Sequence, residues 1–182
     1  MKKIIKPLFS LIAIVLIFSQ SGCLKSELEE LKNSNLKVMF TVDYTYRFLY
    51  NDTVQKGTPK QEILIGRVCE VILKKQTVAI KENGMDGFST TVSYDANSVL
   101  KAGPTGSVTK TMLYTEFQKL IQADQLNKLW VYVTVSDVAT VIPMDNSPAL
   151  GSPGDFSKDR VYRVKASDGS TKDYLIRTVK GF

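Results

Sequence analysis

One stretch of the chain alternates between apolar and polar residues over thirteen positions, from Val38 to Tyr50. The apolar and aromatic members of this alternation are Val38, Phe40, Val42, Tyr44, Tyr46, Phe48 and Tyr50. A period of two places successive side chains on opposite faces of a strand, whereas a helix repeats about every 3.6 residues. The pattern therefore predicts a strand with one buried face, which Asn51 and Asp52 are expected to end.

Further strands are predicted where short β-branched runs lie between turn residues. These runs are 63–73, 77–81, 88–94, 129–135, 161–165 and 174–179. The first two could pair as a hairpin across Lys74, Lys75 and Gln76. The last two flank a turn sequence, in which we expect positive φ angles at Asp168 and Gly169, and so predict a C-terminal hairpin.

One segment changes to helical spacing, at about residues 111–127. Its apolar positions are Leu113, Phe117, Leu120 and Ile121. This spacing predicts an amphipathic helix that faces a core, with Thr115 and Gln118 as a capping pair. Strands in the majority with a single helix favour a mainly β fold, an immunoglobulin-like β-sandwich.

The first 22 residues have the pattern of a signal peptide. Lysines near the start precede an apolar run from Leu8 to Phe18, and Ser21 and Gly22 precede Cys23. A membrane-spanning helix needs about 20 apolar residues, more than this run supplies. The ending resembles a bacterial lipobox, which implies lipid on Cys23 and a mature chain that begins there. The alternative is an ordinary secretory cleavage with Cys23 as a bystander.

Residues 23–36 are interpreted as a lipidated tether and 37–182 as a single domain. An aspartate directly after the lipidated cysteine is the commonest signal for retention in the inner membrane. This chain has Leu24 at that position, so the outer membrane is the favoured location. The mostly acidic stretch from Lys25 to Glu30 resembles the export tags of surface-exposed lipoproteins in Bacteroidota-type bacteria. The alternative for this stretch is a solvated tether.

The chain contains no histidine. This excludes Ser-His-Asp and Cys-His nucleophile systems and removes the commonest zinc ligand. A glycosidase needs a pair of acidic residues, and nothing in the spacing of the acidic residues selects such a pair. The residues considered are Asp43, Glu70, Asp137 and Asp155. We therefore expect no enzyme, no catalytic residue, no metal and no cofactor beyond the covalent lipid.

Charge and cysteine content restrict the partners. Removal of the signal peptide takes away three lysines and no acidic residue, so the net charge falls from +6 to +3. The remaining charges are interspersed, and nucleic acid is not an expected partner. With Cys23 lipidated, Cys69 is the only other thiol, which excludes an intrachain disulfide, and its apolar neighbours predict a buried position.

Trp130 and Tyr132 are the candidate ligand-binding residues. They lie two positions apart in the run 129–135, on the side opposite Leu129 and Val131. Exposed aromatic side chains in this arrangement would form one platform against which sugar rings can stack. The alternative is that both rings lie beneath the helix, in the core.

The C-terminal segment resembles a known family. Asp155-Phe156-Ser157, the run 161–164 and the run 166–174 resemble the "DFS…VxYxVxAxDGSTKxY" ending of immunoglobulin-like domains of unknown function in uncharacterised lipoproteins of Bacteroides-type bacteria. The resemblance implies a sandwich on the cell surface or in the periplasm, often beside outer-membrane transporters that take up glycans. It carries no catalytic residue to transfer.

Two functions follow from these observations. The first is a non-catalytic, membrane-anchored surface lipoprotein that binds a glycan or another ligand, or assists an outer-membrane protein partner. The second is a structural, adhesin or envelope-assembly subunit, because a strand as long as Val38–Tyr50 could add to another sheet.

Overall fold

The computed structural model describes residues 34–103 and 106–182, which form ten strands and one helix. The strands are β1 (Met39–Val54), β2 (Glu62–Ile72), β3 (Lys74–Glu82), β4 (Met85–Ser93), β5 (Leu100–Ala102), β6 (Leu129–Val135), β7 (Thr140–Met144), β8 (Pro153–Gly154), β9 (Arg160–Lys165) and β10 (Thr171–Lys180), and the helix is α2 (Lys110–Asp124). All belong to one compact unit, Asn35–Phe182. The prediction of a mainly β domain with one helix is confirmed, and the signal peptide and Cys23 lie outside the described residues.

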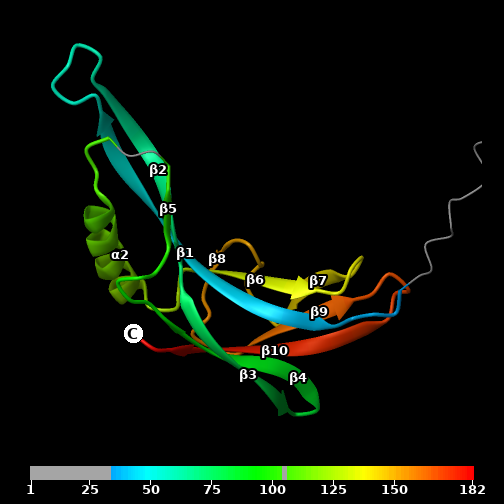
Figure 1. Cartoon of the computed structure of the whole chain (residues 1–182). Helices are drawn as coiled ribbons and strands as arrows, with labels where there is room; N and C mark the ends of the chain where they lie inside the picture. Colours follow the sequence, from blue (N-terminus) through cyan, green and yellow to red (C-terminus); the bar gives the residue numbers. More distant parts are fainter. Residues whose placement is uncertain (1–33, 104–105) are drawn as a thin grey trace, which may run out of the picture. The chain divides into compact units, whose positions relative to one another are not determined.

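The strands form two five-stranded sheets (Figure 1). Sheet A has the order β5-β2-β1-β6-β8 and is antiparallel throughout, whereas sheet B has the order β3-β4-β10-β9-β7 and pairs β4 with β10 in parallel. Two sheets around one core agree with a β-sandwich. The immunoglobulin-like type, whose sheets are antiparallel, stays a prediction.

The predicted face of the first strand is correct from Val42 to Phe48 and wrong at its start. The pairing of β1 with β6 is irregular between Met39 and Thr41, so that one additional residue enters β1. An extra residue exchanges the two faces of a strand on one side of the bulge. Met39 is therefore buried, while Phe40 and Val38 are 55% and 40% exposed.

The expected hairpin between the second and third runs does not form. The structure places β2 in sheet A and β3 in sheet B, and the chain crosses between them at the buried Leu73, whose N–H donates to the Tyr44 carbonyl at 3.0 Å. Asn83 and Gly84 both have positive φ angles, the geometry of a two-residue hairpin turn. The tight turn thus pairs β3 with β4 instead.

Helix α2 confirms the predicted helix, but its cap differs from the prediction. Thr109 is the N-cap and accepts a hydrogen bond from the Met112 N–H at 3.2 Å, whereas Thr115 lies inside the helix and donates to the Thr111 carbonyl. The predicted pair of Thr115 and Gln118 is thus wrong, because the N-cap lies six residues before Thr115. Among the described residues, no helix is both long and apolar enough to cross a bilayer.

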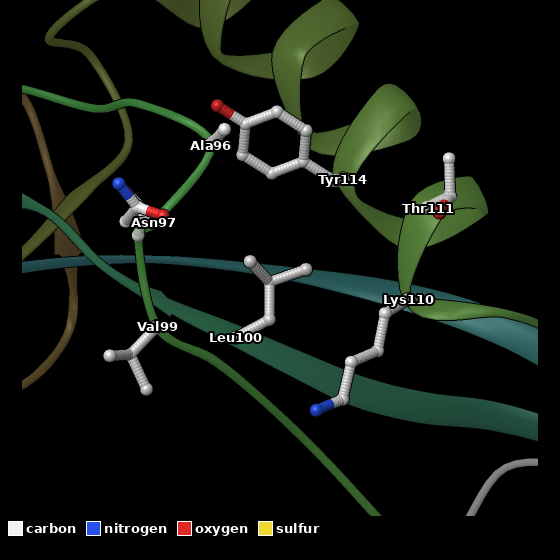
Figure 2. Close-up of a pocket in the computed structure, with 8 residues that line it drawn as sticks. Ala96, Asn97, Val99, Leu100, Lys110, Thr111 and Tyr114 are labelled. Atoms are coloured by element: carbon white, nitrogen blue, oxygen red, sulfur yellow. The ribbon is translucent and has the colours of Figure 1, made fainter.

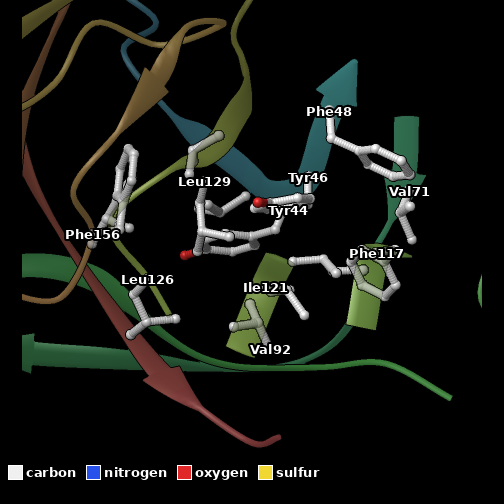
Figure 3. Packing of buried hydrophobic residues seen from close by; sticks show 14 of the residues in the cluster. Tyr44, Tyr46, Phe48, Val71, Val92, Phe117, Ile121, Leu126, Leu129 and Phe156 are labelled. Carbon is white, nitrogen blue, oxygen red and sulfur yellow. The ribbon is translucent and has the colours of Figure 1, made fainter. Parts of the chain in front are cut away.

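The core is shared by both sheets and the helix (Figure 3). Its largest fully buried side chains include Tyr44, Tyr46, Tyr162, Phe117 and Phe156. The phenols of these three tyrosines have hydrogen-bond partners, as polar groups in a core require. Tyr44 Oη and Thr178 Oγ1, 3.1 Å apart, link the two sheets, and Tyr162 donates to the Pro148 carbonyl at 2.7 Å.

Cys69 is fully buried in this core and is a free thiol, as predicted. Burial raises its pKa to about 11, because the thiolate is poorly solvated there. The side chain therefore packs as a small hydrophobe.

The predicted C-terminal hairpin is confirmed as β9 and β10. Tyr162 and Tyr174 are directly opposite each other, and the turn has a positive φ at Gly169. Asp168 is not among the residues with positive φ, so this part of the prediction is wrong. The Asp168 carboxylate instead accepts hydrogen bonds from the Ser170 N–H and hydroxyl, which shapes the turn.

Asp52 was expected to end the first strand, but β1 continues to Val54 and the Asp52 side chain is buried. Its carboxylate accepts hydrogen bonds from the N–H groups of Thr53, Gly106, Ser107 and Val108 at 2.6–3.0 Å. These N–H groups, first that of Gly106, lower its pKa to about 2. Asp52 thus fastens the far end of β1 to the segment that leads into α2, and we call this set of contacts the Asp52 clasp.

Candidate ligand-binding surface

Trp130 and Tyr132 lie on the outer face of sheet A, on the side of β6 that points away from the core. Their neighbours Leu129 and Val131 are fully buried, whereas the two aromatic rings are half-buried and are not part of the core cluster. The alternative that both rings lie beneath the helix is therefore wrong. The alternation in the sequence placed them on the correct face.

Arg47 of β1 joins the two rings. Its guanidinium carbon lies 4.4 Å from the centroid of the Trp130 ring and 5.9 Å from that of Tyr132. Its Nε and Nη2 donate to the same Glu70 carboxylate oxygen at 2.8 and 2.6 Å, and this contact raises the pKa of Arg47. We call Arg47, Glu70, Trp130 and Tyr132 the aromatic platform.

A hollow of about 660 Å³ borders the aromatic platform at the edge of β1. One wall is formed by Tyr46–Leu49 of β1, and another by Glu116, Leu120 and Asp124 of α2. Trp130 also lines the hollow, whereas Tyr132 does not. We call this hollow the edge groove.

Polar groups lie at the helix side of the edge groove. Tyr46 donates to one Asp124 oxygen at 2.6 Å, and the Lys128 ammonium donates to the other at 2.8 Å. Burial alone would raise the pKa of Asp124, but the hydrogen bonds from Lys128 and Tyr46 lower it below its ordinary value. Asp124 is thus a charged, oriented acceptor next to an aromatic wall.

A second hollow of about 530 Å³ lies near the start of α2. Figure 2 shows Lys110, Thr111 and Tyr114 of the helix opposite Asn97 and Leu100. It contains neither of the aromatic residues singled out in the sequence. Of the two hollows, the edge groove is the larger, and it adjoins the aromatic platform, so we take it as the better ligand site.

The acidic residues considered for catalysis are mostly held in ion pairs. Asp43 pairs with Lys75, Glu70 with Arg47 and Asp155 with Arg160, at 2.6, 2.6 and 2.9 Å. Within the described part of the chain, no group of three or more acidic or cysteine side chains is arranged to hold a metal ion. Cys23, the predicted lipidation residue, is outside the part of the chain that the structure describes.

Two features of this surface were not found from the sequence. Arg47 belongs to a different strand from the aromatic rings that it contacts, and the edge groove combines side chains from β1, β2, α2 and β6. No local pattern links these segments. The only signal was the alternation in β1, which placed Arg47 on the polar face.

Comparison with known proteins gives a family match and a fold match. A family model described as DUF5018-related matches residues 38–177. A solved structure from Bacteroides fragilis NCTC 9343, described as a "putative secreted protein", has 24% identity and a TM-score of 0.51, and the match covers 81% of this chain and 97% of that one. At this identity the likeness shows the fold alone. Comparison with curated proteins gives no match.

Proposed function

The chain belongs to the DUF5018-related family, and we propose that it is a non-catalytic outer-membrane lipoprotein that binds carbohydrate, alone or beside a transporter. The observation that carries the proposal is the aromatic platform, in which two half-buried rings and a guanidinium share the outer face of sheet A. The motif that resembles immunoglobulin-like lipoprotein domains supports assigning the sandwich to that type.

The chemistry of the aromatic platform suits a sugar. Aromatic rings offer apolar faces to the C–H groups of a pyranose, and the adjacent charged groups can bind its hydroxyls. Arg47 and Glu70 provide a donor and an acceptor beside the rings, and Asp124 provides a second acceptor in the edge groove. The absence of histidine supports a binding role rather than a catalytic one.

The location rests on the signal peptide pattern and on Cys23. The secreted description of the Bacteroides fragilis protein with the same fold supports export. Two or three acyl chains hold a lipoprotein stably on a membrane, whereas a single chain does not. The domain would then stand on the membrane through its tether, with the outer face of the envelope as its favoured location.

Binding to a panel of purified polysaccharides, measured by affinity electrophoresis, tests the function. We expect retardation by at least one polysaccharide, and an affinity loss of about tenfold, or ~1.4 kcal/mol, in Trp130→Ala and Tyr132→Ala. Phe40→Ala is the matched control, because Phe40 is an exposed aromatic residue of sheet A outside the aromatic platform. Binding that survives both platform substitutions unchanged, or no binding at all, contradicts the proposal.

Metabolic labelling with a palmitate analogue tests the anchor. Wild type and Cys69→Ser should be labelled and Cys23→Ser should not, because Cys69 is buried and carries no lipobox. Equal labelling of wild type and Cys23→Ser would exclude lipidation at this residue. Protease treatment of intact cells then shows whether the domain is exposed on the cell surface or lies in the periplasm.

A further inference from the structure

Strand β1 has an open edge inside the edge groove. It pairs with β2 from Thr45 to Val54, but with β6 only from Met39 to Thr45. On the β6 side the next contact along the strand is the hydrogen bond from the Ser107 N–H to the Thr53 carbonyl, at 3.0 Å. Between these two points, no strand of the described residues pairs with β1 on that side.

The backbone groups that this opening exposes can be identified. The Tyr44 carbonyl accepts from Leu73 on the β2 side, and the groups of successive residues point to alternate sides of a strand. The N–H and C=O groups of Arg47 and Leu49 therefore point into the edge groove. At about 3.3 Å per residue the opening from Thr45 to Thr53 is roughly 26 Å long, which accommodates an extended segment of about seven residues.

On its outer face the opening carries an apolar pair beside the Arg47–Glu70 ion pair. Leu49 and Val68 are directly opposite each other on β1 and β2 and are 69% and 51% exposed. Natural sheets usually protect a free edge with charged residues, as sheet B does with three lysines on β3. The open part of β1 instead carries Phe48, Leu49 and Tyr50 in succession.

The charges in the edge groove are balanced except at one residue. Arg47 is paired with Glu70 and Asp124 with Lys128, whereas Glu116 has no ion pair among the described residues. A ligand with a basic side chain that reaches α2 would complement it.

We propose that the edge groove captures an extended segment of a partner protein by strand addition to β1. The segment carries apolar residues at alternate positions, over Leu49 and Val68, and a lysine or arginine on its other face, towards Glu116. Only another polypeptide backbone offers donors and acceptors at the spacing of a strand edge. The edge groove shares Arg47 and Trp130 with the aromatic platform, whereas Tyr132 belongs to the platform alone, so a peptide and a carbohydrate would occupy adjoining and partly overlapping parts of this surface.

Selection from a displayed library of random peptides tests the proposal. The full-length chain in detergent micelles is the target, and a Leu49→Pro variant is used for counter-selection, because proline removes the N–H that points into the edge groove. We expect enriched sequences with alternating apolar residues and a basic residue. The selected peptide should bind Leu49→Pro at least about tenfold more weakly than Leu49→Ala, which keeps the N–H.

A measurement on the unmodified protein does not depend on how these variants fold. N-methylation of the peptide at the alternate positions that face β1 should abolish binding, whereas methylation at the other positions should not. Bound peptide should also slow hydrogen exchange at the amides of Arg47 and Leu49. The proposal is overturned if no peptide is enriched, if both methylated series bind equally, or if these two amides exchange at the same rate with and without peptide.

Discussion

The hairpins β9–β10 and β1–β2 differ in how completely their strands are paired with neighbouring strands. Strand β10 is paired on both sides, with β9 and with β4. Its charged side chains Asp173 and Arg177 form ion pairs with Arg163 and Asp159. Beyond Thr45, strand β1 is paired on one side only. Large aliphatic side chains exposed along β1–β2 are Leu49, Ile63, Ile65 and Val68.

The two hairpins therefore contribute differently to stability and to binding. A strand paired on both sides has its backbone groups satisfied and stabilises the domain. The turn end of the β1–β2 hairpin extends beyond the other strands of sheet A (Figure 1), and on its inner side the hairpin depends on α2 and on the Asp52 clasp. A region with few buried contacts opens more easily and is the better place for a ligand.

Removal of the main aromatic contact of α2 should give the largest effect. Phe117 is fully buried, with ring centroids of Tyr46 and Tyr94 at 5.7 and 5.0 Å. Phe117→Ala should lower the free energy of unfolding by about 3–5 kcal/mol, because it leaves a cavity between rings. Denaturant unfolding measures the loss, and Phe117→Leu, which fills most of the volume, should lose much less.

Phe117→Ala should also affect the two hairpins unequally. Hydrogen exchange should become faster at the amides of β1 and β2 more than at those of β9 and β10, because α2 packs on the former. An equal increase in both hairpins would show that the domain opens as one unit and that β1–β2 is not the weaker region.

Loss of the Asp52 clasp should have a smaller effect, confined to the β1–β2 side. Asp52→Asn should speed hydrogen exchange at Gly106, Ser107 and Val108 on the order of tenfold, because the amide offers a single acceptor oxygen where the carboxylate offers two. Asp43→Asn, which alters an exposed carboxylate of the same strand, is the control and should leave these amides unchanged.

The clasp also predicts how stability depends on pH. The pKa of Asp52 is lowered from 3.8 to about 2 in the folded state, so its contribution is present above pH 4 and is lost as the pH falls towards about 2. Acid unfolding of Asp52→Asn should therefore be less steep over that interval than that of wild type. Identical acid profiles would contradict the assigned role of Asp52.

The sequence predicted the parts of the fold that depend on neighbours in the chain. The β9–β10 hairpin, α2 and the outward position of Trp130 follow from local periodicity and turn residues. The bulge at Phe40 and the crossing at Leu73 were missed, because both depend on which strand pairs with which. From the sequence, Asp52 was interpreted as a turn residue that ends the strand. Only the fold brings the N–H groups of residues 106–108 to its carboxylate.

Substitution of the exposed aliphatic pair should have the smallest effect on stability. Leu49 and Val68 lie directly opposite each other on β1 and β2 and are mostly exposed, so Leu49→Thr with Val68→Thr should change the free energy of unfolding by no more than about 0.5 kcal/mol per site. Threonine keeps a strand-compatible side chain, so that the β1–β2 pairing is retained.

The matched substitution Val164→Thr, at a fully buried position of β9, should destabilise the domain by ~1–3 kcal/mol because it buries a hydroxyl. Equal losses at the two places, measured by chemical denaturation, would mean that the Leu49–Val68 pair contributes to the core. A large difference would leave these two side chains available for a partner without a cost to the fold.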